Sequence, residues 1–205
     1  MMMRTLSSTL IQGSTYSVVT SVLTLLLSFI RLVVTLQFLT PAEVGEAAFA
    51  IAILYLTHWF REFGLDTAVI QYPDDNTPLH QLLSTHFVLR IIFYIIFVFL
   101  CFTLSFTYVY SLVSPDLFWY LWTLISAEAF VSLGATSTAY IRKAFLIHHM
   151  SMIRIITSLT MKIAGCVMAW IGFGSWAIIV PQAIGLIFAN IYAILVTYKS
   201  YNLWL

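Results

Sequence analysis

Charged residues are scarce in this sequence. Only 8% of its 205 residues are Asp, Glu, Lys or Arg, whereas soluble domains carry about 25%. So few charges cannot cover a water-facing surface, which excludes an ordinary soluble globule. The formal net charge of +1 at pH 7 also excludes the strongly basic footprint of a nucleic-acid-binding domain and an acidic tail. We therefore expect no nucleic acid among the partners.

Cysteine is scarce as well. Cys101 and Cys166 are the two cysteines, and each lies inside an apolar run, VFLCFTL or AGCVMAW. A disulfide needs an oxidising aqueous setting and a metal site needs further ligands nearby, so we interpret both residues as thiols buried in the membrane. The five histidines have no HExxH or CxxC context. We predict neither a metal site nor another cofactor site.

Catalytic motifs are missing from the sequence too. The sequence contains no Gly-rich phosphate loop, no paired carboxylates on a shared exposed face and no nucleophile elbow. It also has no polar stretch large enough to form a soluble domain around such groups. We therefore expect no catalytic residues, and a protein that is not an enzyme.

Long apolar segments take the place of these features. Hydrophobic residues make up 61% of the chain, and the mean hydropathy is +0.98. A helix needs about 20 residues to cross a hydrocarbon core roughly 30 Å thick. Six segments reach this length, at residues 15–39, 43–63, 82–108, 117–141, 153–172 and 175–198. Short links force neighbouring segments to run antiparallel. The sequence predicts one transmembrane domain over residues 1–205, an all-α, up-and-down bundle of about six helices.

The basic residues of the loops predict the orientation of the bundle. Loops on the cytoplasmic side of membrane proteins are enriched in Lys and Arg. If the N-terminus is cytoplasmic, one side of the membrane holds Arg4, Arg142, Lys143, Arg154 and Lys199, and the opposite loops hold neither Lys nor Arg. Both termini are therefore predicted to be cytoplasmic.

A polar stripe runs along the first predicted span. Spacings that alternate between three and four residues place its members on one helix face: Ser14, Ser17, Ser21, Thr24, Ser28, Arg31 and Thr35. The stripe is either the lining of an aqueous cavity or a small-residue seam for helix packing. A cation in mid-membrane costs about 2.5–3.5 kcal/mol, so it needs a polar surrounding. Arg31 therefore favours the cavity, with Thr24, Ser28 and Thr35 beside it.

Three further charged residues within the spans are candidates for the same cavity: Arg90, Glu128 and Lys162. Glu128 and Lys162 lie at similar depth in the fourth and fifth spans. Either they pair with each other, or Lys162 lines the cavity with Arg31 and Glu128 limits its positive charge. Arg90 follows His86 by four residues near the cytoplasmic end of the third span. Snorkelling of its side chain to the headgroups would also explain Arg90, and is the favoured interpretation of the two.

Three motifs lie at boundaries of the predicted helices: RLVVTLQFLTPAEVG at residues 31–45, FGLDTAVIQ at 63–71 and GFGSWA at 172–177. In this order they resemble the polysaccharide exporters of the multidrug/oligosaccharidyl-lipid/polysaccharide flippase superfamily. The first motif is similar to that family's arginine-containing first helix and L-T-P-x-E-x-G turn. FGLDTAVIQ at 63–71 resembles the F-G-L-x-x-A-x-I-Q end of its second helix. GFGSWA at 172–177, with Gln182, is similar to the turn into its sixth helix, and Arg142-Lys143 fits a basic segment after the fourth.

The resemblance implies the N-terminal lobe of a flippase. Such a protein moves an undecaprenyl-pyrophosphate-linked oligosaccharide across the bacterial inner membrane for surface polysaccharide synthesis. Basic cavity residues would meet the pyrophosphate and acidic sugars, a role that falls to Arg31 first and then to Arg90 and Lys162. Because the family has two similar lobes with the cavity between them, the expected partners are membrane lipid, the lipid-linked anionic oligosaccharide and a second six-helix lobe. That lobe would come from the same gene, a neighbouring gene or a second copy of the chain.

Two other functions stay open. A MATE-like, cation-coupled drug antiporter lobe would place acidic residues in mid-membrane, where this chain has Arg31 and Lys162 against Glu128 alone. A non-transporting membrane subunit of a polysaccharide assembly complex would have no hydrated cavity. The sequence specifies neither the oligosaccharide, nor the coupling ion, nor the oligomeric state.

Overall fold

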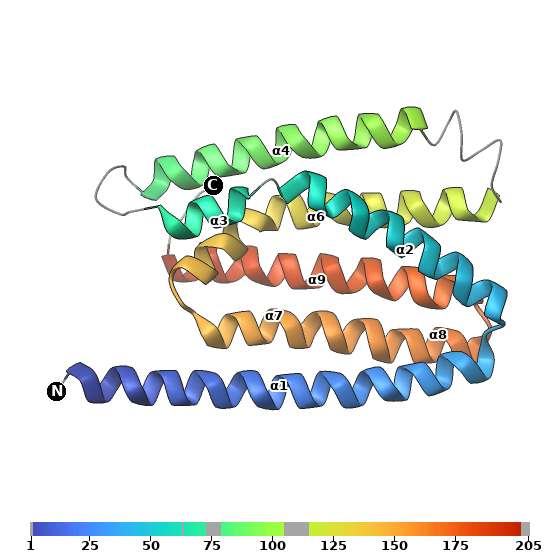
Figure 1. Cartoon of the computed structure of the whole chain (residues 1–205), viewed down its shortest axis with the longest axis horizontal. Helices are drawn as coiled ribbons and strands as arrows, with labels where there is room; N and C mark the ends of the chain where they lie inside the picture. The colour runs from blue at the N-terminus through green and yellow to red at the C-terminus, as the bar shows by residue number, and fades with distance from the viewer. Residues whose placement is uncertain (1, 63, 73–78, 105–114, 202–205) are drawn as a thin grey trace.

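The fold is a bundle of helices (Figure 1). The computed structural model describes the backbone of residues 2–62, 64–72, 79–104 and 115–201, and the side chains of 18–55, 64–72, 79–103 and 115–199. Within these ranges there is no strand, and the prediction of an all-α protein is confirmed. The elements are α1 (Met2–Phe38), α2 (Pro41–Glu62), α3 (Leu65–Gln71), α4 (Leu79–Leu104), α6 (Pro115–Lys143), α7 (Ile147–Leu159), the π-helix η2 (Thr160–Ala164), α8 (Gly165–Ile171) and α9 (Trp176–Tyr201).

Five helical stretches of the described residues are long and apolar enough to cross a membrane: Val18–Phe38, Leu79–Thr103, Pro115–Lys143, Ile147–Ile171 and Trp176–Lys199. The fifth predicted span corresponds to α7, η2 and α8 together, which begin before residue 153. The 22-residue helix α2 occupies the second predicted span, and its last side chains lie outside the described residues. The protein is therefore a multi-pass membrane bundle.

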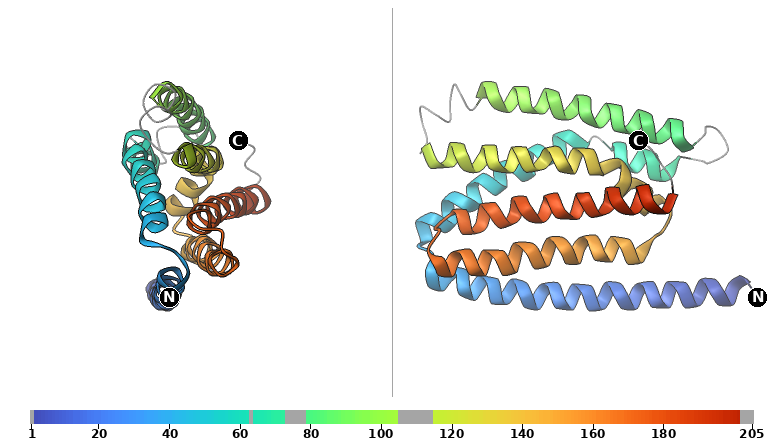
Figure 2. Two further views of the ribbon diagram at one scale, coloured as in Figure 1. Left: turned by 90° about the vertical axis from the view of Figure 1, so that its right-hand side faces the viewer. Right: turned by 180° about the vertical axis from the view of Figure 1, so that it is seen from behind.

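Successive long helices alternate in direction. Figures 1 and 2 show α1, α4 and the continuous α7–η2–α8 helix running one way, and α2, α6 and α9 running the other. The start of α1 and the end of α9 consequently lie towards the same end of the bundle. The α6–α7 connection, with Arg142 and Lys143 before it, also lies at that end, and Asp116 lies at the opposite one.

We expect single cysteines at His80 and Asp116 to be labelled from opposite sides of the membrane. Both residues are exposed, at the starts of α4 and α6. In a background without Cys101 and Cys166, the cysteine at Asp116 should react with an impermeant thiol reagent in intact cells. The cysteine at His80 should react only after permeabilisation, because its end of the bundle carries the basic residues. Labelling of both from outside would contradict the alternating arrangement.

The centre of the bundle is the antiparallel pair α6 and α9. Gly134 on α6 makes this close packing possible, since a Cβ there would lie 2.5 Å from Oδ1 of Asn190 on α9. A buried apolar cluster joins the pair to α2 through Ala47, Ala50, Leu54, Leu117, Leu124 and Ile179. Small residues thus let the central helices approach closely, as is common in membrane bundles.

Helix α1 lies at the edge of the bundle and packs along α7, η2 and α8. The turn at the end of α1 leads into α2, which then runs away from α1. The Glu43 carboxylate accepts hydrogen bonds from the backbone N–H of Thr40, at 2.7 Å, and from its hydroxyl, at 2.8 Å. This capping box starts α2 at Pro41, and α2 then crosses towards α6 and α9. The spatial neighbour of the first span is therefore the fifth span.

Candidate functional site

A pocket of about 250 Å³ lies between α1, η2 and α9, where α1 meets the rest of the bundle. Its lining comprises Ser28, Arg31, Leu32, Thr35, Lys162 and Ile178. Four of these were candidate cavity residues on sequence grounds: Ser28, Arg31, Thr35 and Lys162. The structure thus brings the first-span stripe together with the cation of the fifth span.

Arg31 occupies the space that a glycine leaves open. A Cβ on Gly165, the first residue of α8, would lie 3.3 Å from Nε of Arg31 and 3.2 Å from the backbone oxygen of Ala177. A side chain at this position would require the Arg31 side chain or the α9 backbone to shift by a few tenths of an ångström. Sequence reasoning missed Gly165, although a glycine inside a predicted span is a signal of close approach.

Lys162 projects from the π-helix η2, a type of distortion that is frequent at functional sites. Its Nζ donates a hydrogen bond to the backbone oxygen of Thr24 on α1. Ser28 Oγ donates to the same oxygen over 2.8 Å. The Thr24 hydroxyl itself donates to the backbone oxygen of Ser21, so Thr24 contributes to the site through its carbonyl. Lys162 therefore ties the fifth span to α1 beside Arg31.

Two cations and two hydroxyl groups line one pocket, a combination that can attract an anion. The like charges of Arg31 and Lys162 repel each other, and an anion between them would remove that repulsion. The guanidinium can hold a phosphate through two parallel hydrogen bonds, and the ammonium adds a point charge. The Thr35 hydroxyl can donate a further hydrogen bond, whereas the Ser28 hydroxyl donates to the Thr24 backbone oxygen.

Glu128 is buried on α6, with 4% of its surface exposed. It does not belong to the pocket lining, which comes from α1, η2 and α9. The structure has Lys162 on the pocket lining beside Arg31, with Glu128 outside that lining.

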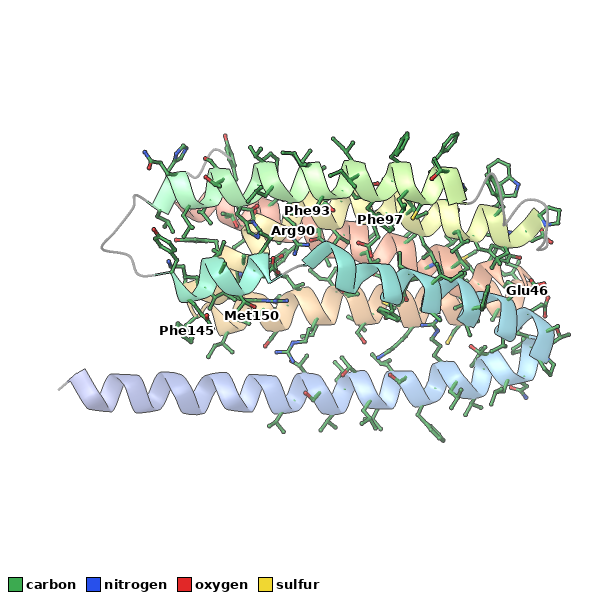
Figure 3. The ribbon with its side chains drawn as sticks, turned by 45° about the horizontal axis from the view of Figure 1, so that its top comes forward. Glu46, Arg90, Phe93, Phe97, Phe145 and Met150 are labelled. Carbon is green, nitrogen blue, oxygen red and sulfur yellow. The ribbon has the colours of Figure 1, made fainter. Side chains whose placement is uncertain are left out.

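Arg90 lies elsewhere in the bundle, outside the lining of the pocket that holds Arg31. Its side chain is 5% exposed, and its Nη2 donates to Oδ1 of Asp66 on α3 over 2.6 Å. Figure 3 shows Arg90 with Phe93 and Phe97 on the side of α4 that faces α6, far from the end of the bundle that holds Glu46. Arg90 is thus part of a buried ion pair, and neither lines the pocket nor snorkels to the headgroups.

The family comparison agrees with the membrane bundle. The family described as "Polysaccharide biosynthesis protein" matches residues 34–204, most of the chain. The chain belongs to this family. No curated protein and no solved structure matches it significantly. The predicted family is confirmed, and the chain has a role in polysaccharide biosynthesis.

Two of the motifs that carry the family resemblance meet at one end of this polysaccharide biosynthesis protein. Gly174, in the turn before α9, has a left-handed φ of 57°, and a Cβ on it would lie 2.6 Å from Oε1 of Glu43. The adjacent Ser175 hydroxyl donates to Oε2 of Glu46 over 3.3 Å. The glycine therefore meets both a conformational and a steric requirement, and the contact joins the start of α2 to the start of α9.

Asp66 on α3 is the centre of a cluster of charged side chains that sequence reasoning missed. Its Oδ1 is 3.2 Å from Nε2 of His86 and its Oδ2 is 3.8 Å from Nη1 of Arg142, in addition to the bond with Arg90. Burial raises the pKa of Asp66, but the hydrogen bond with His86 and the charge of Arg90 outweigh it, so that the net pKa lies below the ordinary value. The carboxylate is therefore the form that holds α3 in place. Its stabilisation is present above the ordinary carboxyl pKa and is lost as the pH falls through the lowered value.

Proposed function

We propose that this protein is the N-terminal lobe of a flippase that moves an undecaprenyl-pyrophosphate-linked oligosaccharide across the bacterial inner membrane. The observation that carries the proposal is the joint placement of Arg31 and Lys162 on one pocket inside an apolar bundle. Unpaired cations are expensive at membrane depth, and their retention marks a path for an opposite charge. The diphosphate of a lipid-linked sugar supplies that charge.

The apolar surroundings of the pocket support a lipid-linked substrate rather than a free anion. Leu32 and Ile178 belong to the lining itself. Outside it, Leu25 and Leu36 on α1 are 71% and 66% exposed. A polyprenyl chain can lie against such a surface while its headgroup contacts the two cations. Apolar surroundings stabilise the hydrocarbon chain, and water does not.

The basic residues at one end would place both termini in the cytoplasm. A second six-helix lobe, from the same gene, a neighbouring gene or a second copy, would close the pocket from the side of α1. The pocket offers cations and hydroxyls for holding an anion, so the proposed role is passage of the substrate without bond making.

The MATE-like antiporter and the non-transporting subunit are weaker candidates. An antiporter for cationic drugs would need acidic groups on the pocket, and its lining contains Arg31 and Lys162. A purely structural subunit would gain nothing from these two charges, whose burial is costly. The pocket therefore favours passage of an anion over both alternatives.

A strain that lacks this protein should accumulate the lipid-linked oligosaccharide on the cytoplasmic leaflet. Synthesis on that leaflet continues, because the protein makes no bonds, but the diphosphate headgroup cannot cross the lipid. Leaflet-specific enzymatic digestion of labelled lipid-linked sugar in intact and opened vesicles measures its location, and the restored gene is the control. Loss of synthesis would indicate an assembly subunit, and unchanged distribution with increased drug sensitivity would indicate an antiporter. Either result would contradict the proposal.

A further inference from the structure

An exposed aromatic ring lies in the turn between α6 and α7, at the end of the bundle opposite to the one that holds Glu46 (Figure 3). Phe145 is 80% exposed, the largest value among the exposed large apolar side chains that the structure describes. The turn joins two of the membrane spans, Pro115–Lys143 and Ile147–Ile171. The ring therefore lies near the depth at which the hydrocarbon core of a bilayer gives way to its headgroups.

The backbone of Phe145 has a conformation that favours glycine. Its φ is 52°, and it is the one non-glycine residue with a positive φ in the described part of the chain. Its N–H donates to the backbone oxygen of Arg142 over 3.1 Å, and the N–H of Leu146 donates to that of Ile141 over 3.1 Å. These two hydrogen bonds form a Schellman motif, whose left-handed position glycine usually occupies. A phenylalanine there is strained and gains little packing, so its ring points to a function outside the fold.

Two cations end the helix just before this ring. Arg142 is 47% exposed, and its Nη1 lies 3.8 Å from Oδ2 of Asp66, beyond hydrogen-bonding distance. Asp66 is held more closely by Arg90, at 2.6 Å. Lys143 donates from Nζ to the backbone oxygen of Tyr72 over 2.9 Å. One carboxylate that faces two guanidinium groups, with an ammonium beside them, leaves a positive balance among the described residues of this surface.

A pocket of about 250 Å³ adjoins the cations, between the start of α4 and the end of α6. Its lining combines apolar groups with an ammonium and comprises Leu79, Tyr140, Lys143 and Ala144. The α3–α4 connection at residues 73–78, with Asp74 and Asp75, lies outside the described part of the chain. The pocket thus offers a cation and an apolar wall side by side at the end of two spans.

We propose that this turn binds an anionic phospholipid of the bilayer, with the phosphate at Arg142 and Lys143 and the ring of Phe145 among the upper carbons of the acyl chains. Basic residues beside a span attract anionic lipid, and basic pockets between transmembrane helices bind anionic headgroups. Aromatic rings at membrane surfaces lie at the boundary between headgroups and acyl chains. A water-soluble anion would use the two cations but not the exposed ring. The site shares no residue with the pocket that holds Arg31, so the proposal does not rest on the proposed flippase function.

Photocrosslinking from position 145 identifies what contacts the ring. The whole chain, with p-benzoylphenylalanine in place of Phe145, is reconstituted into vesicles of equal parts phosphatidylglycerol and phosphatidylcholine, and mass spectrometry identifies the adducts. The anionic adduct should exceed the neutral one about fivefold or more, since each basic residue near the surface contributes about that factor. Equal amounts of the two adducts, or no lipid adduct, would overturn the proposal.

Phe173 provides the matched control position. It is 51% exposed in the turn between α8 and α9, at the opposite end of the bundle. Its neighbours in that turn, Gly174 and Ser175, lie against the acidic side chains of Glu43 and Glu46. The same photoreactive residue at position 173 should give no excess of the anionic adduct. An equal excess at both positions would show that the cations of the α6–α7 turn do not select the lipid, contrary to the proposal.

Two variants remove the cations one at a time. Arg142→Gln and Lys143→Gln should each lower the excess of the anionic adduct at position 145, by up to about fivefold, and the double variant should bring the two adducts to equal amounts. Raised salt should lower the excess in the parent, because exposed charges are screened. Circular dichroism establishes that each variant is folded. An unchanged excess in the folded double variant would overturn the proposal.

Phe145→Gly separates lipid binding from folding. Glycine fits the left-handed φ, so the variant in detergent should melt at the same temperature as the parent or higher, while it retains less phosphatidylglycerol through purification. A large fall in melting temperature would show that the ring stabilises the fold, and would overturn the proposal. Crosslinks in cells from position 145 to a protein instead of a lipid would overturn it as well, because the turn would then be a docking surface for a protein.

Discussion

Replacement of Arg31 by Ala in the complete transporter is expected to abolish polysaccharide export and to leave the amount of protein in the membrane near normal. The guanidinium lies in the pocket against Gly165 and beside Lys162. Without it the pocket loses the group that can hold a diphosphate through paired hydrogen bonds. Surface polysaccharide on intact cells measures export, and immunoblots of membranes measure the amount of protein.

The conservative and control variants make this experiment specific. Arg31→Lys should keep part of the activity, because the positive charge remains while the two-pronged geometry is lost. Arg154→Ala removes the same group from an exposed position on α7, outside the pocket lining, and should export normally. If Arg31→Ala exported normally, or failed to accumulate in the membrane, the polar stripe of α1 would be a packing seam.

The long helices could be predicted because the bilayer requires a length that few other structures need. Apolar runs of about 20 residues identify spans without any knowledge of packing, and prolines mark where two of them begin, at Pro41 and Pro115. The short helix α3 has no such signature. Gly64, with a left-handed φ of 73°, separates it from α2 and is the one local signal that a new element begins there. The π-helix η2 differs from the flanking α-helices in its backbone hydrogen bonds. Its amino-acid composition gives no signal of that difference.

The candidate site was predicted in part, for a similar reason. Helical spacing gives the face on which Arg31 lies, and it gives the depth of Lys162, but it does not give the neighbours of a helix. That α1 packs against the fifth span follows from the path of α2 after its capping box, which is a tertiary feature. The partner of Arg90 escaped prediction because Asp66 is on a short element that the apolar pattern did not reveal.

The open side of the pocket leads to a prediction about the isolated chain. Helix α1 is little covered, with 6% of its most apolar stretch buried. Ser21 and Ser28 are exposed on it, and Arg31 and Lys162 lie next to them. Facing lipid, the charges of Arg31 and Lys162 would have no opposite charge on the pocket lining, at a cost of about 2.5–3.5 kcal/mol for a cation in mid-membrane. A second lobe packed against this face would remove that cost and would enclose the site at the interface, where transporters built of two repeats bind their substrates.

Residues 1–205, reconstituted into liposomes as a monomer, should therefore insert and fold but show no flipping of a labelled polyprenyl-diphosphate sugar. Flipping should appear when a matching second lobe is supplied, or a second copy if the chain forms a symmetric pair. Addition of an unrelated six-helix membrane protein is the control for nonspecific leakage. The pocket by itself should still bind inorganic pyrophosphate weakly, since its two cations belong to this lobe. Fast flipping by the demonstrable monomer would contradict the two-lobe argument and, with it, the placement of the Arg31 stripe at an interface between lobes.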